Sequence, residues 1–248
     1  MLLREALAID DHDIVAVIGA GGKTSAVRRL AVEFHQLRRR VLVLSTTKIE
    51  AQRGAIDTQL CDSLATACAA ARSRRAGDLP LLIVTEQLPT RLRGVPVDWV
   101  APLAAWADVT LVQADGAGRR SFKAPAAHEP VIPAQATLVA AVAGIDAIGK
   151  PIDERHMHRP ERVAEFAGVA LGTPLTIDAA ARVLLHPRGG FRDVSPATRR
   201  AIVLNRVDGQ PELDIASSLT AAIRTHAAIL VIATALQSPD PVRAVWGG

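Results

Sequence analysis

The stretch "DIVAVIGAGGKTSAVRRLAVEF" (residues 13–34) decides the fold. An apolar run leads into a glycine-rich turn, and apolar residues at helical spacing follow, which predicts a strand, a tight turn and a helix. A helix that begins at such a turn presents free N–H groups, so its N-terminus is suited to binding an anion. Dinucleotide-binding folds and the phosphate loop of nucleoside triphosphatases both have this arrangement, and they hold different cofactors.

The order of apolar and amphipathic segments in the rest of the chain predicts the fold class. Runs rich in Val, Ile and Leu without polar alternation are typical of strands buried on both faces. Strand–helix alternation predicts an α/β fold with a mainly parallel sheet and helices on both faces, the three-layer sandwich of P-loop NTPases. The predicted strands are residues 14–18, 41–45, 81–84, 109–114, 137–143, 201–204 and 229–233, and the predicted helices are residues 24–37, 58–72, 163–168, 177–185 and 212–226.

The length of 248 residues is compatible with a single α/β nucleotide-binding domain over residues 1–248. Residues 116–196 differ from the rest, because they are rich in Pro, His and Arg. We expect them to form an elaboration over the C-terminal edge of the sheet, where ligands bind in folds of this class.

The glycine turn itself favours a phosphate loop. A dinucleotide fingerprint needs a third glycine at position 24 and an acid after the second strand, but Thr24 stands at that position and the second strand runs into Ser-Thr-Thr-Lys. A phosphate loop instead needs Gly-Lys-[Ser/Thr], which residues 22–24 supply, although only two residues separate Gly19 from Gly22. The alternative is an ordinary strand-to-helix turn with a stray lysine.

In a phosphate loop each residue of the turn has its own role. Lys23 would neutralise the β- and γ-phosphates, and the Thr24 hydroxyl would bind Mg²⁺. The N–H groups of the turn and the helix start would hold phosphate oxygens; the residues concerned are Gly19, Ala20, Gly21, Gly22, Lys23, Thr24 and Ser25.

Two further residues at strand ends are candidates for the same site. Asp115 follows an apolar strand and is predicted as a second Mg²⁺ ligand or as the carboxylate that orients water; a turn aspartate is the alternative. Lys48, after Thr46 and Thr47, is suited to a γ-phosphate or a substrate anion, unless this segment is only a satisfied strand-end turn.

The region after Asp115 carries further polar candidates. Arg119, Arg120 and Lys123 are predicted to stabilise the charge of a transferring phosphate, and His128 with Glu129 forms a candidate acid/base or metal-binding pair. Three histidines in this region are also candidates for a transition-metal site, with solvated loop histidines as the alternative; they are His128, His156 and His158.

The segment "AIVLNRVDG" (residues 201–209) resembles the N-K-x-D pattern of GTPases, with Arg206 in place of lysine. In GTPases the aspartate accepts hydrogen bonds from guanine that adenine cannot offer. Asn205 and Asp208 therefore favour GTP over ATP, and the false-positive rate of a four-residue motif leaves ATP open.

Composition excludes several classes of function. The 29 basic and 25 acidic residues are interleaved, and with no Tyr, four Phe and three Trp the chain has few rings for stacking on bases, so we expect no nucleic acid partner. No apolar run reaches about 18 residues, so we expect no membrane span. The two cysteines, Cys61 and Cys68, are predicted to be core residues on one helix in a reducing cytoplasm.

Taken together, these segments resemble the YqeC family of accessory proteins of selenium-dependent molybdenum hydroxylases. The matching stretches are "VIGAGGKTS", "STTKI", "ADGAGRRSFKAPAAHEPVIP", "GIDAIGKPIDERHMHRPE" and "LNRVD". The resemblance implies a P-loop-like protein that helps to mature a molybdenum- and selenium-containing enzyme, with that hydroxylase or its cofactor precursor as partner. Gln113 stands where family members often carry an acid, which weakens a two-carboxylate metal site.

The leading hypothesis is therefore a Mg²⁺-dependent protein that binds GTP or ATP and hydrolyses it or transfers its phosphoryl group. A non-enzymatic carrier of a cofactor precursor or a selenium species, with nucleotide as a switch, is the alternative. A dinucleotide-dependent oxidoreductase is a distant third, since Thr24 breaks its fingerprint. The oligomeric state is left open by the sequence.

Overall fold

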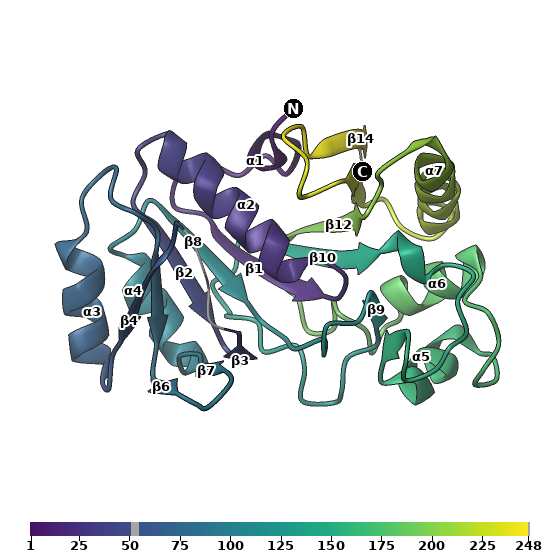
Figure 1. The fold of residues 1–248 in the computed structure, drawn as a ribbon, viewed down its shortest axis with the longest axis horizontal. Coiled ribbons are helices and arrows are strands. Elements are labelled where there is room, and N and C mark those ends of the chain that lie inside the picture. Colours follow the sequence, from purple (N-terminus) through teal and green to yellow (C-terminus); the bar gives the residue numbers. More distant parts are fainter. Residues whose placement is uncertain (51–54, 248) are drawn as a thin grey trace.

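The computed structural model describes residues 1–50 and 55–247. Its main feature is a nine-stranded sheet with the order β14-β13-β12-β10-β1-β8-β2-β5-β4 (Figure 1). All neighbouring strands in it are parallel except β13 and β14, which are antiparallel. The predicted α/β fold with a mainly parallel sheet is confirmed.

The strands of this sheet are β1 (Ile14–Gly19), β2 (Val41–Ser45), β4 (Asp57–Leu60), β5 (Leu81–Val84), β8 (Val109–Gln113), β10 (Leu138–Gly144), β12 (Arg199–Asn205), β13 (Leu230–Thr234) and β14 (Val242–Trp246). The seven predicted strands all occur, with ends shifted by at most two residues. They are buried along nearly their whole length because helices cover both faces.

Two layers of helices enclose the sheet. On one face lie α1 (Leu3–Ala6) and α2 (Lys23–Gln36), and α2 runs across the sheet in Figure 1. The other face carries α3 (Leu64–Ser73), α4 (Val100–Ala104), α5 (Pro160–Ala167), α6 (Ile177–Leu185) and α7 (Gln210–Arg224). Alternate side chains of β1 point to opposite faces of the sheet: Val15 and Val17 pack in the core with α2, and Ala16 and Ile18 pack in the core on the other face.

The predicted helix over residues 58–72 is wrong at its start. Residues 57–60 form the edge strand β4, which pairs with β5, and α3 begins only at Leu64, where the Ser63 side chain accepts a hydrogen bond from Thr66 N. All four residues of β4 are exposed, so the strand has no apolar pattern that the sequence could reveal. Cys61 consequently precedes the helix; it is buried, and Cys68 on α3 is partly buried, so the two do not share a helix face.

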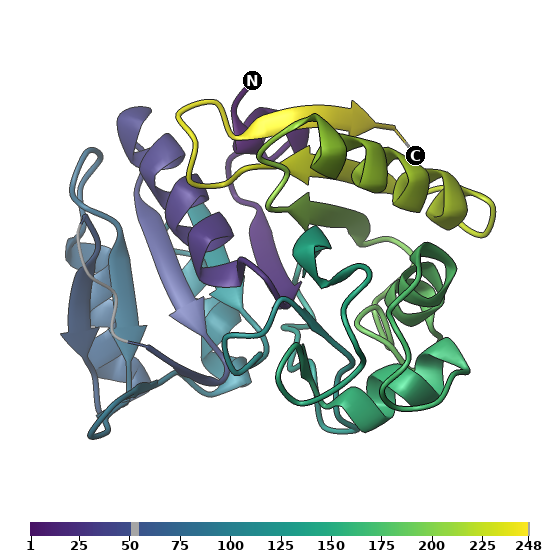
Figure 2. The ribbon, with the colours of Figure 1, turned by 45° about the vertical axis from the view of Figure 1, so that its right-hand side comes forward.

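Short strands add two small sheets near the carboxyl ends of the main strands. One contains β3 (Lys48–Ile49), β6 (Glu86–Gln87) and β7 (Leu92–Arg93), and the other pairs β9 (Phe122–Lys123) with β11 (Met157–His158). Residues 116–196 thus contribute one strand, β10, to the main sheet. They also form β9, β11, α5 and α6, and Figure 2 shows α5 and α6 close together beside the sheet.

Strand register brings distant residues to one edge. Gly19 pairs with Val142, Gln113 pairs with Ser45 of β2, and Gly144 pairs with Asn205. Because parallel strands end at the same edge, the turn after β1 lies among the ends of β2, β8, β10 and β12. This edge holds the candidate site.

Candidate nucleotide-binding site

A cavity of about 490 Å³ opens at the carboxyl edge of the sheet around the start of α2. Its lining residues come from the turn after β1 and from segments that follow β2, β8, β12 and β13. Among them are six basic and two acidic side chains: Lys23, Lys48, Arg91, Arg119, Arg120 and Arg206, and Glu50 and Asp208. Its size lies within the range of small-molecule sites, and its charge suits an anion.

The N-terminus of α2 faces this cavity without a cap. Gly22 precedes the helix with no side-chain hydrogen bond, and the first turn has no acidic residue. The first intrahelical bond runs from Ala26 N to Gly22 O, so the N–H groups of Lys23, Thr24 and Ser25 have no helical acceptor. Gly22, Lys23, Thr24 and Ser25 all line the cavity, so these donors are available to an anion there.

The earlier part of the turn is committed to the protein instead. The N–H of Gly19 donates to Asp115 Oδ2 at 2.9 Å, that of Ala20 to Val142 O at 2.8 Å, and that of Gly21 to Arg120 O at 2.9 Å. Gly19 and Ala20 also lie outside the cavity lining. In this structure the candidate anion donors are therefore the N–H groups of the helix start, not the full cradle of residues 19–25 that the sequence predicts.

Gly21 fixes the path of the turn against β10. Its φ is +77°, a left-handed conformation that favours glycine. An added Cβ would lie 2.3 Å from Gly144 N and 2.5 Å from Ser121 O, both backbone atoms. A side chain at this position is therefore incompatible with the close packing of the turn.

Asn205 holds the same turn from the other side. Its Nδ2 donates to Gly21 O at 2.7 Å, and its Oδ1 accepts from Leu236 N at 3.2 Å and from Thr234 Oγ1 at 3.3 Å. The side chain is buried with its polar atoms satisfied. Asn205 therefore connects the turn to the end of β13. Asn205 and Asp208 were predicted to recognise guanine, and of these two only Asp208 has an exposed side chain at the cavity.

Lys23 turns back under the loop in this state. Its Nζ donates to Gly19 O and lies 3.1 Å from Asp115 Oδ1. Burial lowers the pKa of Lys23, while the charge of Asp115 opposes that shift. The lysine thus contacts the cavity and a buried carboxylate together.

Asp115 lies beneath the cavity rather than in its lining. Its Oδ2 accepts hydrogen bonds from Gly19 N and Lys123 Nζ, each at 2.9 Å. Its Oδ1 is buried without a hydrogen bond, although Lys23 Nζ is near. The Lys23 ammonium is the counter-charge of Oδ1 here, so direct contact between Oδ1 and a metal ion in the cavity would require Lys23 to move.

A buried chain of alternating charges continues from Asp115 into residues 116–196. Lys123 Nζ donates to Asp115, to Glu129 Oε2 at 2.8 Å and to Gly116 O at 2.6 Å. Arg159 in turn donates two hydrogen bonds to Glu129, at 2.7 and 3.1 Å. We call these residues the buried ion chain: Lys23, Asp115, Lys123 and Glu129, which are buried, and Arg159, which ends the chain and is partly exposed. Lys123, predicted to face a transferring phosphate, is buried and faces the two carboxylates instead.

The chain determines the protonation of two neighbouring groups. Burial by itself raises the pKa of Glu129, but the Arg159 hydrogen bonds and the Lys123 charge outweigh it and lower the pKa to about 2. Burial and the charges of Arg159 and Lys123 lower the pKa of His158 to about 4. At neutral pH Glu129 is therefore ionised and His158 is neutral.

The structure separates the other predicted polar groups. His128 is exposed while Glu129 next to it is buried, so they do not face one cavity. His156 pairs with Asp153 at 2.7 Å, and His158 lies beside Gly118. Among residues 1–50 and 55–247 no group of three or more His, Cys, Asp or Glu side chains is placed to hold a metal ion, so His128, His156 and His158 do not form a joint site.

Thr24, Gln113 and Lys48 border the cavity. Thr24 Oγ1 donates to Gln113 Oε1 at 3.2 Å, which places two neutral oxygens beside the helix start. The hydroxyl of Thr46, by contrast, donates to Val131 O and belongs to a satisfied strand-end turn. Lys48 lines the cavity, and its role towards an anion stays a prediction.

Several lining residues were absent from the sequence interpretation. They are Ile49, Glu50, Arg91, Ala117, Gly118, Ala235, Leu236 and Gln237. Ala235–Gln237 directly follow β13, so a strand-end position was the signal that could have found them. Arg91 precedes a two-residue strand with no apolar pattern, and only the fold brings it to the cavity.

The fold and this site define a three-layer α/β protein with a glycine turn, an uncapped helix start and a basic cavity at the carboxyl edge of its sheet. The chain belongs to the YqeC family, whose family model, described as YqeC protein, matches residues 15–161. It is similar to the uncharacterized protein YqeC of Escherichia coli (strain K12), with 27% identity over 225 residues, which is 86% of this chain and 83% of that protein. No helix of residues 1–50 and 55–247 is both long and apolar enough to cross a membrane.

Proposed function

We propose that this chain is a Mg²⁺-dependent protein that binds a nucleoside triphosphate, GTP or ATP, and hydrolyses it or transfers its phosphoryl group. The observation that carries the proposal is the uncapped start of α2, with Lys23 in its first turn, at the edge of the cavity. Three free N–H groups and an ammonium match the requirements of a polyphosphate chain. A nucleotide supplies that chain together with a base that the rest of the cavity can contact.

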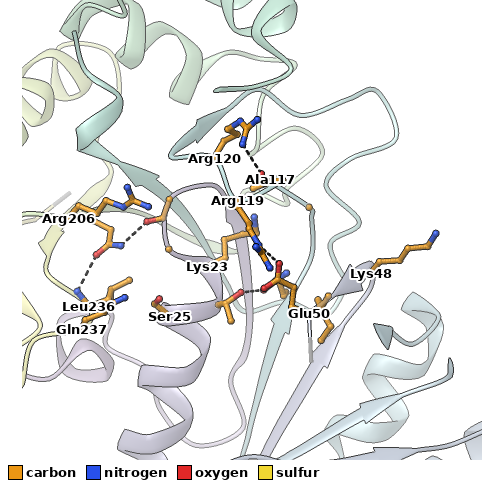
Figure 3. A pocket seen from close by; sticks show the side chains of 18 of the residues that line it. Lys23, Ser25, Lys48, Glu50, Ala117, Arg119, Arg120, Arg206, Leu236 and Gln237 are labelled. Atoms are coloured by element: carbon orange, nitrogen blue, oxygen red, sulfur yellow. Dashed lines mark hydrogen bonds and ion pairs between the residues drawn. The ribbon is translucent and has the colours of Figure 1, made fainter. Parts of the chain in front are cut away.

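The side of the cavity formed by residues after β12 and β13 suits the base and ribose. It combines apolar and polar side chains, including Leu236, Gln237 and the exposed Asp208. In Figure 3 Arg206, Leu236 and Gln237 lie on one side of Lys23. An aspartate at this position favours guanine, whose N1–H and amino group are donors, so GTP is the preferred nucleotide and ATP the alternative.

Mg²⁺ fits this site as an ion that enters with the nucleotide. Magnesium is commonly held by one or two protein groups, phosphate oxygens and water rather than by a cage of side chains. Thr24 and Gln113 offer oxygens at the cavity, and Asp115 Oδ1 is a buried carboxylate oxygen that is paired with Lys23 in the absence of a ligand. When bound, the ion would neutralise phosphate charge, and Lys23 would hold the β- and γ-phosphate oxygens.

In this proposal Lys23 exchanges partners when nucleotide binds. Its ammonium moves from Asp115 towards the phosphates, and Lys123 keeps Asp115 neutralised from the other side. This compensation makes release of Lys23 less costly than breaking an isolated buried ion pair. Asp115 keeps its hydrogen bond to Gly19 N and would orient the loop through it, and its Oδ1, once released by Lys23, would be able to accept a hydrogen bond from an attacking water.

The family resemblance supports a role as accessory factor in the maturation of a selenium-dependent molybdenum hydroxylase. A non-enzymatic carrier of a cofactor precursor or selenium species, with nucleotide as a switch, is the second candidate. The observation that favours it is the buried ion chain, which joins the loop after β1 to residues 116–196. Of its members, Lys23 lines the cavity and the other four do not.

Calorimetric titration of the protein with GTP, ATP and CTP, with and without Mg²⁺, tests the proposal. We expect Mg²⁺-dependent binding that weakens about 100-fold or more in Lys23→Ala, because a desolvated ammonium–phosphate contact is lost. Equal affinity of wild type and Lys23→Ala would contradict it. Released phosphate, measured on the same samples, separates the enzyme from the carrier, which would bind nucleotide without turnover.

A further inference from the structure

The cavity has a second side whose charge the nucleotide does not explain. We define it as the basic wall, formed by Lys48, Glu50, Arg91 and Arg119. In Figure 3 Lys48 and Glu50 lie on the opposite side of Lys23 from Arg206, Leu236 and Gln237. A triphosphate held at the start of α2 with its base among the latter residues would therefore direct its terminal phosphate towards the basic wall.

The basic wall has more positive than negative charge. Arg119 Nε donates to Glu50 Oε1 at 2.6 Å, and this hydrogen bond, with smaller contributions from Arg119 and Arg91 charge, lowers the pKa of Glu50. Glu50 is therefore ionised and offsets one of three cations. Lys48 is exposed, and its Nζ has no hydrogen bond or ion pair with any residue the structure describes.

Paired strands position this lysine. Lys48 and Ile49 form β3, whose register with β7 pairs Ile49 with Leu92, and both of these side chains are buried. The Arg119–Glu50 ion pair joins the loop after β8 to the end of β3. Binding groups held by strands and ion pairs keep their geometry better than groups on free loops.

We propose, on the basis of the nucleotide-binding function above, that the basic wall binds a second small molecule through a phosphate group, next to the terminal phosphate of the nucleotide. The excess of two positive side chains matches a phosphate monoester, which carries about −1.5 to −2 charges at pH 7. Lysine and arginine are the side chains that bind phosphate, as a point charge and as a planar fork respectively. The second ligand is thus a phosphorylated substrate or acceptor rather than a neutral molecule.

The test uses inorganic phosphate as the probe. The protein is first saturated with Mg²⁺ and a β,γ-imido nucleotide analogue, and phosphate is then titrated calorimetrically at constant ionic strength, because salt screens exposed charges. We expect saturable binding at one site. Affinity should fall about fivefold or more in Lys48→Gln and in Arg91→Gln, since each removes one charge contact, while nucleotide affinity stays unchanged.

Lys150→Gln is the matched control, since Lys150 is an exposed lysine outside the cavity; it should bind phosphate like the wild type. Acetate, titrated in the same way, distinguishes a carboxylate from a phosphate site, and equal binding of acetate would overturn the phosphate assignment. Nucleotide binding without any phosphate binding would overturn the inference and leave the proposed function intact. A loss of nucleotide affinity in Lys48→Gln as large as in Lys23→Ala would assign the wall to the nucleotide and also overturn it. The titration of the wild type with nucleotide, before phosphate is added, tests the proposed function itself. If the wild type binds no nucleotide, the proposed function is overturned.

Discussion

Lys123 Nζ lies 2.9 Å from Asp115 Oδ2, and the two side chains are only 2% and 3% exposed. A buried ion pair of this kind is costly to desolvate, and it is retained only when further partners satisfy both charges. Glu129 and Gly116 O provide them for Lys123, and Gly19 N provides one for Asp115. The contact therefore connects the loop after β1 with residues beyond β8.

Removing Lys123 should destabilise the fold strongly. Lys123→Met leaves two buried carboxylates with fewer compensating charges, so the free energy of unfolding should fall by about 3–5 kcal/mol. Urea unfolding of wild type and variant measures it. Lys150→Met, at an exposed lysine, should stay within about 0.5 kcal/mol of the wild type. An unchanged urea midpoint in Lys123→Met would show that the buried ion chain does not stabilise the fold.

Asn205 should matter for both stability and ligand affinity. Asn205→Ala leaves Gly21 O and Leu236 N without their side-chain partner, so we expect a loss of about 1–3 kcal/mol in unfolding free energy. Nucleotide affinity should fall about tenfold because the turn is less well fixed. Asp208→Asn is the comparison: Asp208 is exposed, so stability should stay within about 0.5 kcal/mol while the GTP-to-ATP preference declines. If the two variants behave alike, the separate roles given to Asn205 and Asp208 are wrong.

A methyl group at Gly21 should disrupt the loop. Gly21→Ala places a Cβ 2.3 Å from Gly144 N at a φ of +77°, and we expect a cost of about 3 kcal/mol or more from the clash and the left-handed backbone together. Gly149→Ala is a close control, because Gly149 has a φ of +78° and nothing within 4 Å of its added Cβ. That variant should lose only the backbone cost of about 1–2 kcal/mol. Thermal unfolding of both compares them, and equal losses would mean that packing against β10 is not the reason for glycine.

Acidification should weaken the fold in two steps. The pKa of His158, which faces Arg159, Lys123, Glu129 and Lys23, is lowered from 6.5 to about 4. The unfolded chain therefore takes up this proton first, and stability falls between pH 6.5 and 4. The pKa of Glu129 is lowered from 4.5 to about 2, so its stabilisation is present above pH 4.5 and is lost between pH 4.5 and 2.

Urea unfolding at several pH values between 7 and 4.5 measures the first step. We expect a decline of about 1–2 kcal/mol, discounted for the partial exposure of His158. His158→Gln should flatten the curve in that range. A wild-type curve that is already flat from pH 7 to 4.5 would contradict the lowered pKa of His158.

Local patterns in the sequence determined most of the main sheet. Continuous apolar runs predicted seven of its strands, because burial on both faces leaves an unmistakable composition. The pattern failed for β4 and β14, which lie at the two edges and are largely or half exposed, and for the short strands around the cavity. Edge and two-residue strands are defined by pairing partners rather than by their own hydrophobicity.

The turn at residues 19–25 and the strand-end positions of Lys48, Asp115 and Asn205 were likewise readable in the sequence, because a parallel sheet gathers its strand ends at one edge. Tertiary structure alone decided what each side chain contacts there. In the folded protein Asn205 donates a hydrogen bond to Gly21 O, Asp115 is buried between Lys23 and Lys123, and His128 lies exposed on the surface. Residues as distant in sequence as Lys23 and Arg159 belong to one chain of ion pairs. The physical reason is that burying a lysine or a carboxylate without a partner is costly. Only the packing of residues 116–196 against the sheet edge supplies those partners.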